Sequence, residues 1–191
     1  MPEKCKLCPR ECGIDRSVKT GRCGVSDEIR LARVGLHVWE EPCLSYGAGS
    51  GTVFFSGCVL GCVFCQNHEI SRGKKGYPVS VQTLADEFLR LQEMGAVNIN
   101  LVTPTQYTDK ILLALDKAKP RLSIPVVYNC GGYEKPETLR TLDGYVDIFL
   151  PDFKYFSKEA AAKYSGAPNY FDMASAALEE IYRLVGYARF V

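Results

Sequence analysis

The chain has 191 residues, of which 47% are hydrophobic and 24% are charged, and its formal net charge is +1. This composition predicts a soluble globular protein that is long enough to bury one sizeable core. A net charge so close to zero gives no bulk attraction to nucleic acid or to an acidic membrane, so neither is expected as a partner. The sequence has no run of 18 apolar residues and no apolar signal region at its start, so we expect no transmembrane helix and a cytoplasmic location.

The nine cysteines fall into a group of four near the N-terminus, a group of three in one loop, and two single residues, Cys43 and Cys130. In a reducing compartment this usage favours metal or redox chemistry over disulfides. The first group has the pattern Cys5-x2-Cys8-x3-Cys12-x10-Cys23, and we assign residues 1–28 to a Cys-rich metal-binding module. Four thiols complete either a zinc site or an iron–sulfur cluster, and the spacing decides neither between them nor against a segment without a stable metal.

Residues 29–51 are predicted to form short strands and a linker. Apolar residues alternate with other residues between positions 29 and 39, which indicates one or two strands. His37, in this stretch, is more typical of a strand surface than of a metal site. The glycine-rich residues 46–51 then form a flexible connection into the first strand of the core.

A third stretch holds the pattern Cys58-x3-Cys62-x2-Cys65, which follows the apolar, strand-like residues 52–55. Three thiolates on a short loop can hold three irons of a [4Fe–4S] cluster. Because such a cluster has four irons, one iron would stay open to bind another molecule. The alternatives are three ordinary buried cysteines or half of a zinc site.

From residue 52 onward, strands and helices are predicted to alternate. Ser80 is the expected N-cap of the first helix, and Gly95 follows its end. A strand at 97–102 places Asn98 and Asn100 on one face, where a polar barrel interior or a ligand would have to satisfy them. The other expected elements are strands at 124–129 and 146–150 and helices at 109–119, 136–142, 158–163 and 174–185.

This alternation predicts an α/β fold with a parallel sheet, right-handed crossovers and an active site at the C-terminal ends of the strands. Glycines, prolines and polar residues gather at four such ends, at 58–65, 103–105, 129–132 and 152–154. Four strand ends that point to one rim indicate an enzyme.

The central motif, with Phe64 before its third cysteine, resembles that of the radical S-adenosylmethionine (radical SAM) superfamily. The longer string from Phe55 to Asn67 resembles the branch related to pyruvate formate-lyase activating enzymes, and so does the N-terminal cysteine pattern. The resemblance implies a partial (β/α) barrel over residues 52–191, preceded by the Cys-rich module. It also implies that the open iron binds the amino and carboxylate groups of SAM.

The resemblance assigns roles to individual residues. The cluster ligands would be Cys58, Cys62 and Cys65, and Phe64 would pack near the adenine or simply within the loop. The family's Gly-Gly-Glu-like turn is absent, and Thr103 and Thr105 stand where it would hold the SAM amino group.

Two further strand ends would complete the cofactor site. Asn129 and Gly131 would contact the methionyl or ribose part of SAM. Asp152 and Lys154 resemble the Asp-x-Lys motif of glycyl-radical activating enzymes, with a surface ion pair as the alternative. The family commonly has a basic residue where this chain has Gly61.

The function that follows is reductive cleavage of SAM to a 5′-deoxyadenosyl radical, with a glycyl-radical enzyme as the partner to be activated. A flavodoxin or ferredoxin would supply the electron. Only four βα units are visible, whereas the family core has six, and residues 187–191 resemble the start of a fifth strand. The alternative is therefore a truncated, catalytically incompetent iron–sulfur protein. A zinc-binding interaction domain would leave the central motif unexplained.

Overall fold

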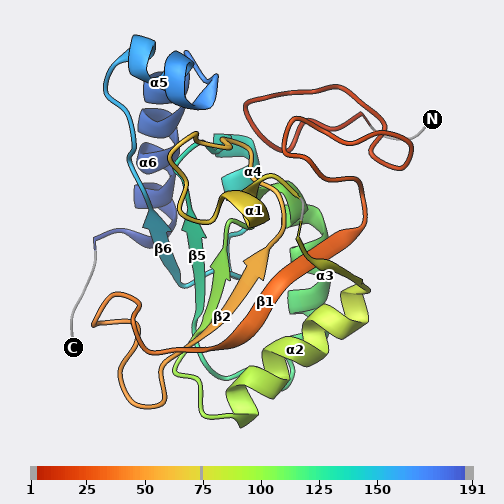
Figure 1. Ribbon diagram of the computed structural model, residues 1–191. Helices are drawn as coiled ribbons and strands as arrows, with labels where there is room; N and C mark the ends of the chain where they lie inside the picture. The colour runs from red at the N-terminus through yellow and green to blue at the C-terminus, as the bar shows by residue number, and fades with distance from the viewer. Residues whose placement is uncertain (1–3, 74, 188–191) are drawn as a thin grey trace.

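The computed structural model describes residues 4–73 and 75–187 (Figure 1). Its centre is a six-stranded sheet in the order β3-β1-β2-β4-β5-β6. The strands are β1 (Ile29–His37), β2 (Ser50–Phe55), β3 (Tyr77–Val79), β4 (Ile99–Val102), β5 (Val126–Cys130) and β6 (Ile148–Pro151). The helices are α1 (His68–Ser71), α2 (Val81–Glu93), the 3-10 turn η1 (Thr105–Tyr107), α3 (Thr108–Ala118), α4 (Pro136–Arg140), α5 (Lys158–Ser165) and α6 (Tyr170–Val185).

Strands β2, β4, β5 and β6 are parallel, and β1 and β3 extend the sheet in antiparallel fashion at the β2 edge. The predicted α/β fold with four parallel strands is therefore confirmed. The expected one or two short strands at 29–39 form a single nine-residue strand, which pairs with both β2 and β3. Sequence patterns missed β3, α1 and η1, because three or four residues are too few to show a period.

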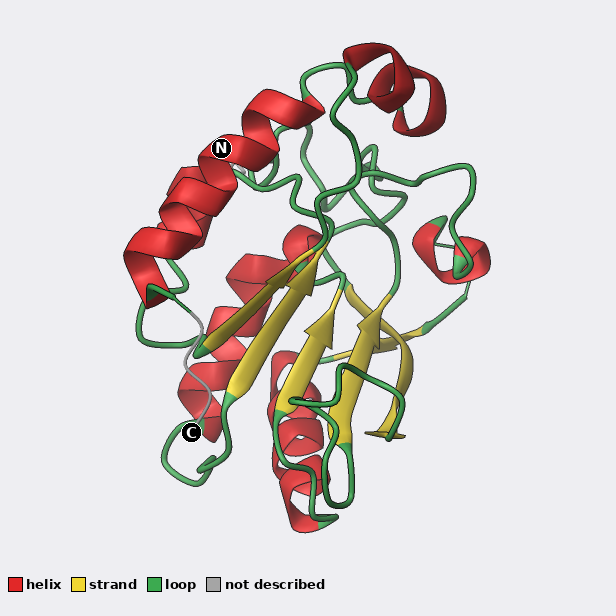
Figure 2. Ribbon diagram, turned by 90° about the vertical axis from the view of Figure 1, so that its left-hand side faces the viewer, coloured by secondary structure: helices red, strands yellow, loops and turns green. Residues whose placement is uncertain are grey.

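The long helices pack on one face of the sheet, and loops lie over the other (Figure 2). On the helical face, Phe88 of α2 and Ile111 of α3 are fully buried with Leu101 of β4 in one apolar core. Helix α2 begins where predicted, because the Ser80 hydroxyl accepts a hydrogen bond of 3.0 Å from the Thr83 backbone N–H.

Asn98, just before β4, and Asn100, within it, both donate hydrogen bonds to the loop between β1 and β2, although the buried side-chain oxygen of Asn100 has no hydrogen-bond partner among the described residues. Asn98 donates to the Leu44 carbonyl at 2.7 Å and accepts from the Ser50 hydroxyl at 2.6 Å. Asn100 donates to Glu40 at 2.9 Å. Residues 38–49, expected as little more than a linker, therefore close one end of the inner face of the sheet.

Residues 4–28 contain no helix or strand, and β1 begins at Ile29. Within the described ranges, no helix is long and apolar enough to cross a membrane. The fifth strand predicted at 187–191 lies, apart from Tyr187, outside the described residues.

Candidate functional site

A cavity of about 910 Å³ occupies the inner face of the sheet, at the side that the long helices leave open. Strands β1, β2, β4, β5 and β6 all contribute to its wall, with residues that include Arg33, Phe54, Val102, Asn129 and Leu150. The cavity continues to the C-terminal ends of the parallel strands, where the predicted site residues lie. All ten residues predicted for the central cluster and SAM line it: Cys58, Cys62, Phe64, Cys65, Thr103, Thr105, Asn129, Gly131, Asp152 and Lys154.

The three cysteines of the loop after β2 lie at the rim of this cavity. Cys62 is buried, and the Ser165 hydroxyl donates to its sulfur at 2.9 Å. Burial raises the pKa of Cys58, and the nearby Cys62 and Cys65 raise it further by charge repulsion. Three thiolates placed this close repel one another, so they need a positively charged centre to hold them together. The irons of a cluster would supply that positive charge.

The donor set of this loop fits a cluster better than a single ion. Within residues 4–73 and 75–187, no three cysteine, histidine or carboxylate side chains are grouped as one metal ion requires. A four-iron cluster places each thiolate on a different iron, so its ligands need not converge on one point. Cys58, Cys62 and Cys65 are the residues of this chain that would hold it.

Gln106, a buried residue of η1, holds the start of the cysteine loop in place. Sequence patterns did not single out this residue. Its side-chain amide donates to the carbonyls of Ser56 and Gly57, both at 3.1 Å, and to that of Thr103 at 2.9 Å. This one side chain therefore ties the start of the cysteine loop to the end of β4. A buried amide in a turn of three residues leaves no periodic signal by which to find it.

Thr103 and Thr105 follow β4, and each is held by a different contact. Thr103 has a left-handed backbone, with φ of +57°, and its N–H donates to the Asn129 carbonyl at 2.9 Å. The Thr105 hydroxyl lies 2.7 Å from a carboxylate oxygen of Glu134. The two threonines and the end of β5 therefore form one connected wall.

Glu134 is fully buried and was not predicted as part of the site. Burial raises the pKa of its carboxyl group to about 8, and contacts to Thr105, Cys130 and Tyr128 oppose the rise. No cation pairs with it in the described part of the chain. At neutral pH the Glu134 carboxyl group is therefore mostly protonated and uncharged, and it contacts the Thr105 hydroxyl.

The opposite wall is formed by the ends of β5 and β6. The Tyr170 hydroxyl accepts from the Lys154 backbone N–H at 2.8 Å and lies 2.8 Å from the Gly131 carbonyl, to which it can donate. Lys154 and Asp152 form an ion pair in which Asp152 is largely exposed. Phe64 is 60% exposed, and its ring meets the Tyr164 ring edge-on at 6.2 Å.

The N-terminal cysteines lie close to one another and to the central loop. A side chain on Gly21 would begin 3.2 Å from the Cys23 sulfur and 3.9 Å from that of Cys12. Burial raises the pKa of Cys8 to about 12, and charge repulsion from Cys23 and Cys12 contributes to the rise. The pKa of Cys23 is also raised, by burial first and by repulsion from Cys5 and Cys12.

The N-terminal segment is also bonded to the central loop. The Cys58 N–H donates to the Cys23 carbonyl at 3.1 Å. Arg10 donates to the carbonyls of Val59 at 2.8 Å and Ser165 at 2.7 Å, and to that of Gly166. Arg10 therefore ties the N-terminal segment to the central loop and to the end of α5.

An α/β sheet with four parallel strands, and with three cysteines beside a cavity at its strand ends, is consistent with a partial radical SAM fold. The family model of the Radical SAM superfamily matches residues 52–187, and the chain belongs to this superfamily. The superfamily is one of enzymes that use a [4Fe–4S] cluster and SAM. An uncharacterized protein of Methanocaldococcus jannaschii is 31% identical over 180 residues, which cover 90% of this chain and 51% of that protein. The chain thus spans about half the length of this relative. No solved structure gives a significant match.

Proposed function

We propose that Cys58, Cys62 and Cys65 hold the [4Fe–4S] cluster and that the 910 Å³ cavity binds SAM. The observation that supports this most strongly is that one cavity collects residues from five separate strands and loops, including all three thiols. When bound, the cluster supplies one electron for the cleavage of SAM to methionine and a 5′-deoxyadenosyl radical. The cavity size lies within the range of ligand pockets.

The polar groups of the cavity complement the charges of SAM. The oxygens of Thr103 and Thr105 can accept hydrogen bonds from its amino group, and Lys154 offers a positive charge to its carboxylate. The Glu134 carboxyl group, which contacts Thr105 and is mostly protonated at neutral pH, adds no negative charge that would repel that carboxylate. Asn129 and Gly131 supply amide and backbone groups on the neighbouring strand end.

The substrate of the proposed enzyme is a polypeptide, namely a glycyl-radical enzyme from which a backbone hydrogen is abstracted. Asp152 and Lys154 support this through their likeness to the Asp-x-Lys motif, and the rim of the cavity adds a second argument. Trp39 is 86% exposed and Phe64 60% exposed, and both line the opening. Exposed aromatic side chains at a rim suit contact with another protein.

The proposal is tested by anaerobic metal analysis and electron paramagnetic resonance with and without SAM. We expect about four irons per chain in the central site and a signal that SAM changes. Cys58→Ala should lose this iron, whereas the control Cys43→Ala, at an exposed single cysteine, should keep it. Absence of iron would refute the proposal. Iron whose signal ignores SAM would instead favour an iron–sulfur protein without catalysis.

The same analysis identifies the metal of the N-terminal cysteines. About eight irons would place a second cluster on Cys5, Cys8, Cys12 and Cys23, and about four irons with one zinc would give that segment a structural zinc site. The glycyl-radical role is tested with candidate partners. A protein that releases 5′-deoxyadenosine but never produces a glycyl-radical signal would refute that role alone.

A further inference from the structure

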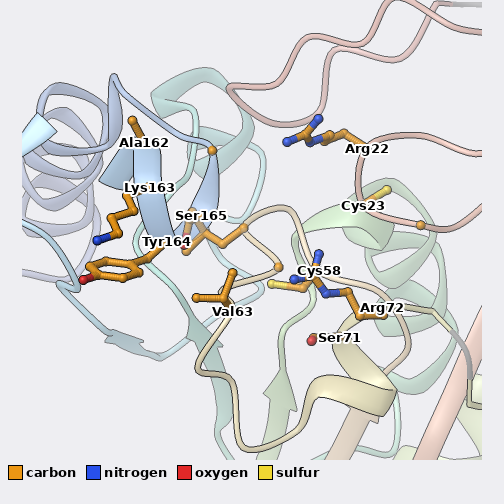
Figure 3. A pocket seen from close by; sticks show the side chains of 14 residues that line it. Arg22, Cys23, Cys58, Val63, Ser71, Arg72, Ala162, Lys163, Tyr164 and Ser165 are labelled. Carbon is orange, nitrogen blue, oxygen red and sulfur yellow. The ribbon is translucent and has the colours of Figure 1, made fainter. Parts of the chain in front are cut away.

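A second cavity, of about 380 Å³, lies between the N-terminal segment, the cysteine loop and the C-terminal end of α5 (Figure 3). Its lining includes three cations, Arg22, Arg72 and Lys163, and no carboxylate. Cys58 lines both this cavity and the larger one. The same thiol is therefore reached from two sides of the loop.

The Arg72 guanidinium group lies beside Cys58, and the Arg22 side chain lies on the side of the N-terminal segment (Figure 3). One nitrogen of Arg72 lies 3.2 Å from the point where a side chain on Gly61 would begin, so Arg72 restores a positive charge where the loop has a glycine. One nitrogen of Arg22 lies 2.8 Å from the same point on Gly166, at the end of α5. Because glycine has no side chain, Gly61 leaves space for the Arg72 guanidinium group and Gly166 leaves space for that of Arg22.

Arg22, Arg72 and Lys163 have no ion-pair partner in residues 4–73 and 75–187, where nine ion pairs occur. Arg10 and Arg16, in the same N-terminal segment, use their guanidinium groups on backbone carbonyls. The three cations of the cavity are therefore available to an acidic partner, although the whole chain carries a net charge of only +1.

Apolar side chains lie among these charges. Val63 is 64% exposed and Tyr164 37% exposed, and the Val63 N–H donates to the Tyr164 carbonyl at 2.9 Å. The Lys163 ammonium group turns outward over the Tyr164 ring, 5.3 Å from its centre (Figure 3). An apolar patch with a charged border is typical of protein interfaces.

We propose that this surface, formed by Arg22, Val63, Arg72, Lys163 and Tyr164 and named the basic face, docks an acidic one-electron carrier protein beside Cys58. The inference rests on the proposed function, because it supplies the electron that SAM cleavage consumes. The carrier is oxidised by one electron, which passes to the cluster, and no bond forms or breaks in this transfer. Since Cys58 lines both cavities, the electron enters on one side while SAM and substrate use the other.

The test measures the affinity of an acidic flavodoxin for the cluster-loaded protein at low and at high salt. The variant Arg22→Gln/Arg72→Gln/Lys163→Gln should bind at least about tenfold more weakly at low salt and lose most of its salt dependence. The control Lys117→Gln/Arg121→Gln/Lys158→Gln removes the same charge from exposed positions elsewhere and should bind within about twofold of the original protein.

A second readout compares rates of 5′-deoxyadenosine formation with flavodoxin and with dithionite, a small reductant that needs no docking. The ratio of the two rates should fall about tenfold in the basic-face variant and stay constant in the control. Unchanged affinity in the basic-face variant, or an equal loss in both variants, would overturn the inference. If dithionite yields no 5′-deoxyadenosine, the proposed function is refuted. The flavodoxin affinities of the two variants would still test the basic face separately.

Discussion

Replacing Glu134 by glutamine should change how the stability of the protein depends on pH. Glu134 is fully buried, and burial raises its pKa from 4.5 to about 8. Between these values the folded protein holds a proton that the unfolded chain has released. The free energy of unfolding therefore falls as the pH rises through this window, and the contribution is greatest below pH 4.5.

The size of the effect follows from the two pKa values. Each pH unit inside the window costs about 1.4 kcal/mol, which amounts to about 3.5 kcal/mol between pH 5 and pH 8. For a chain of this length the melting temperature should then fall by about 7 to 14 °C over that range. Burial also raises the pKa of the neighbours Tyr128 and Cys130, so both stay neutral there.

The assay is thermal unfolding of the reconstituted protein, under anaerobic conditions, at a series of pH values. Glutamine cannot ionise, and its side-chain oxygen can still accept from Thr105. Glu134→Gln should therefore match the original protein at pH 5 and exceed its stability by about 3.5 kcal/mol at pH 8. The control Glu137→Gln, at an exposed position on α4, should follow the original curve. Parallel curves for all three proteins would refute the reasoning.

Three further substitutions test the contacts that hold the cysteine loop. Gln106→Leu leaves three backbone carbonyls without their donor and should lower the free energy of unfolding by about 2–4 kcal/mol, measured by thermal unfolding. Gly57→Ala should cost about 3 kcal/mol or more, because the new methyl group would lie 2.6 Å from the Cys23 carbonyl. Gly144→Ala, also at positive φ but with open space around it, should cost only about 1 kcal/mol, and equal losses would contradict the close approach at Gly57. Arg10→Ala should increase cleavage of residues 4–25 in limited proteolysis about tenfold, and an unchanged rate would show that its three carbonyl contacts do not hold the segment.

Sequence patterns predicted the α/β class because the signals involved are local. The four parallel strands and the start of α2 at Ser80 depend on residues a few positions apart. The spacing of Cys58, Cys62 and Cys65 likewise concerns eight consecutive residues. The convergence of the four strand ends followed from one rule about parallel sheets, and the cavity that collects all ten predicted residues agrees with it.

Contacts between distant segments were not predictable in this way. β1 pairs with β2 and β3 in an antiparallel edge, although its residues alone indicated only short strands. Gln106 and Glu134 are isolated polar residues whose importance comes from burial against other segments. Burial is a property of the assembled fold, so no pattern along the chain marks these two positions.

The sequence by itself determined which residues are candidates for the chemistry: the cysteines, by their spacing, and the polar strand ends. Only the tertiary structure decided how they are held and from which sides they are reached. Arg10 contacts carbonyls 155 and 156 positions away, and the Cys23 carbonyl bonds the amide of Cys58. Such contacts depend on where the sheet brings separate loops together, which local propensities do not encode.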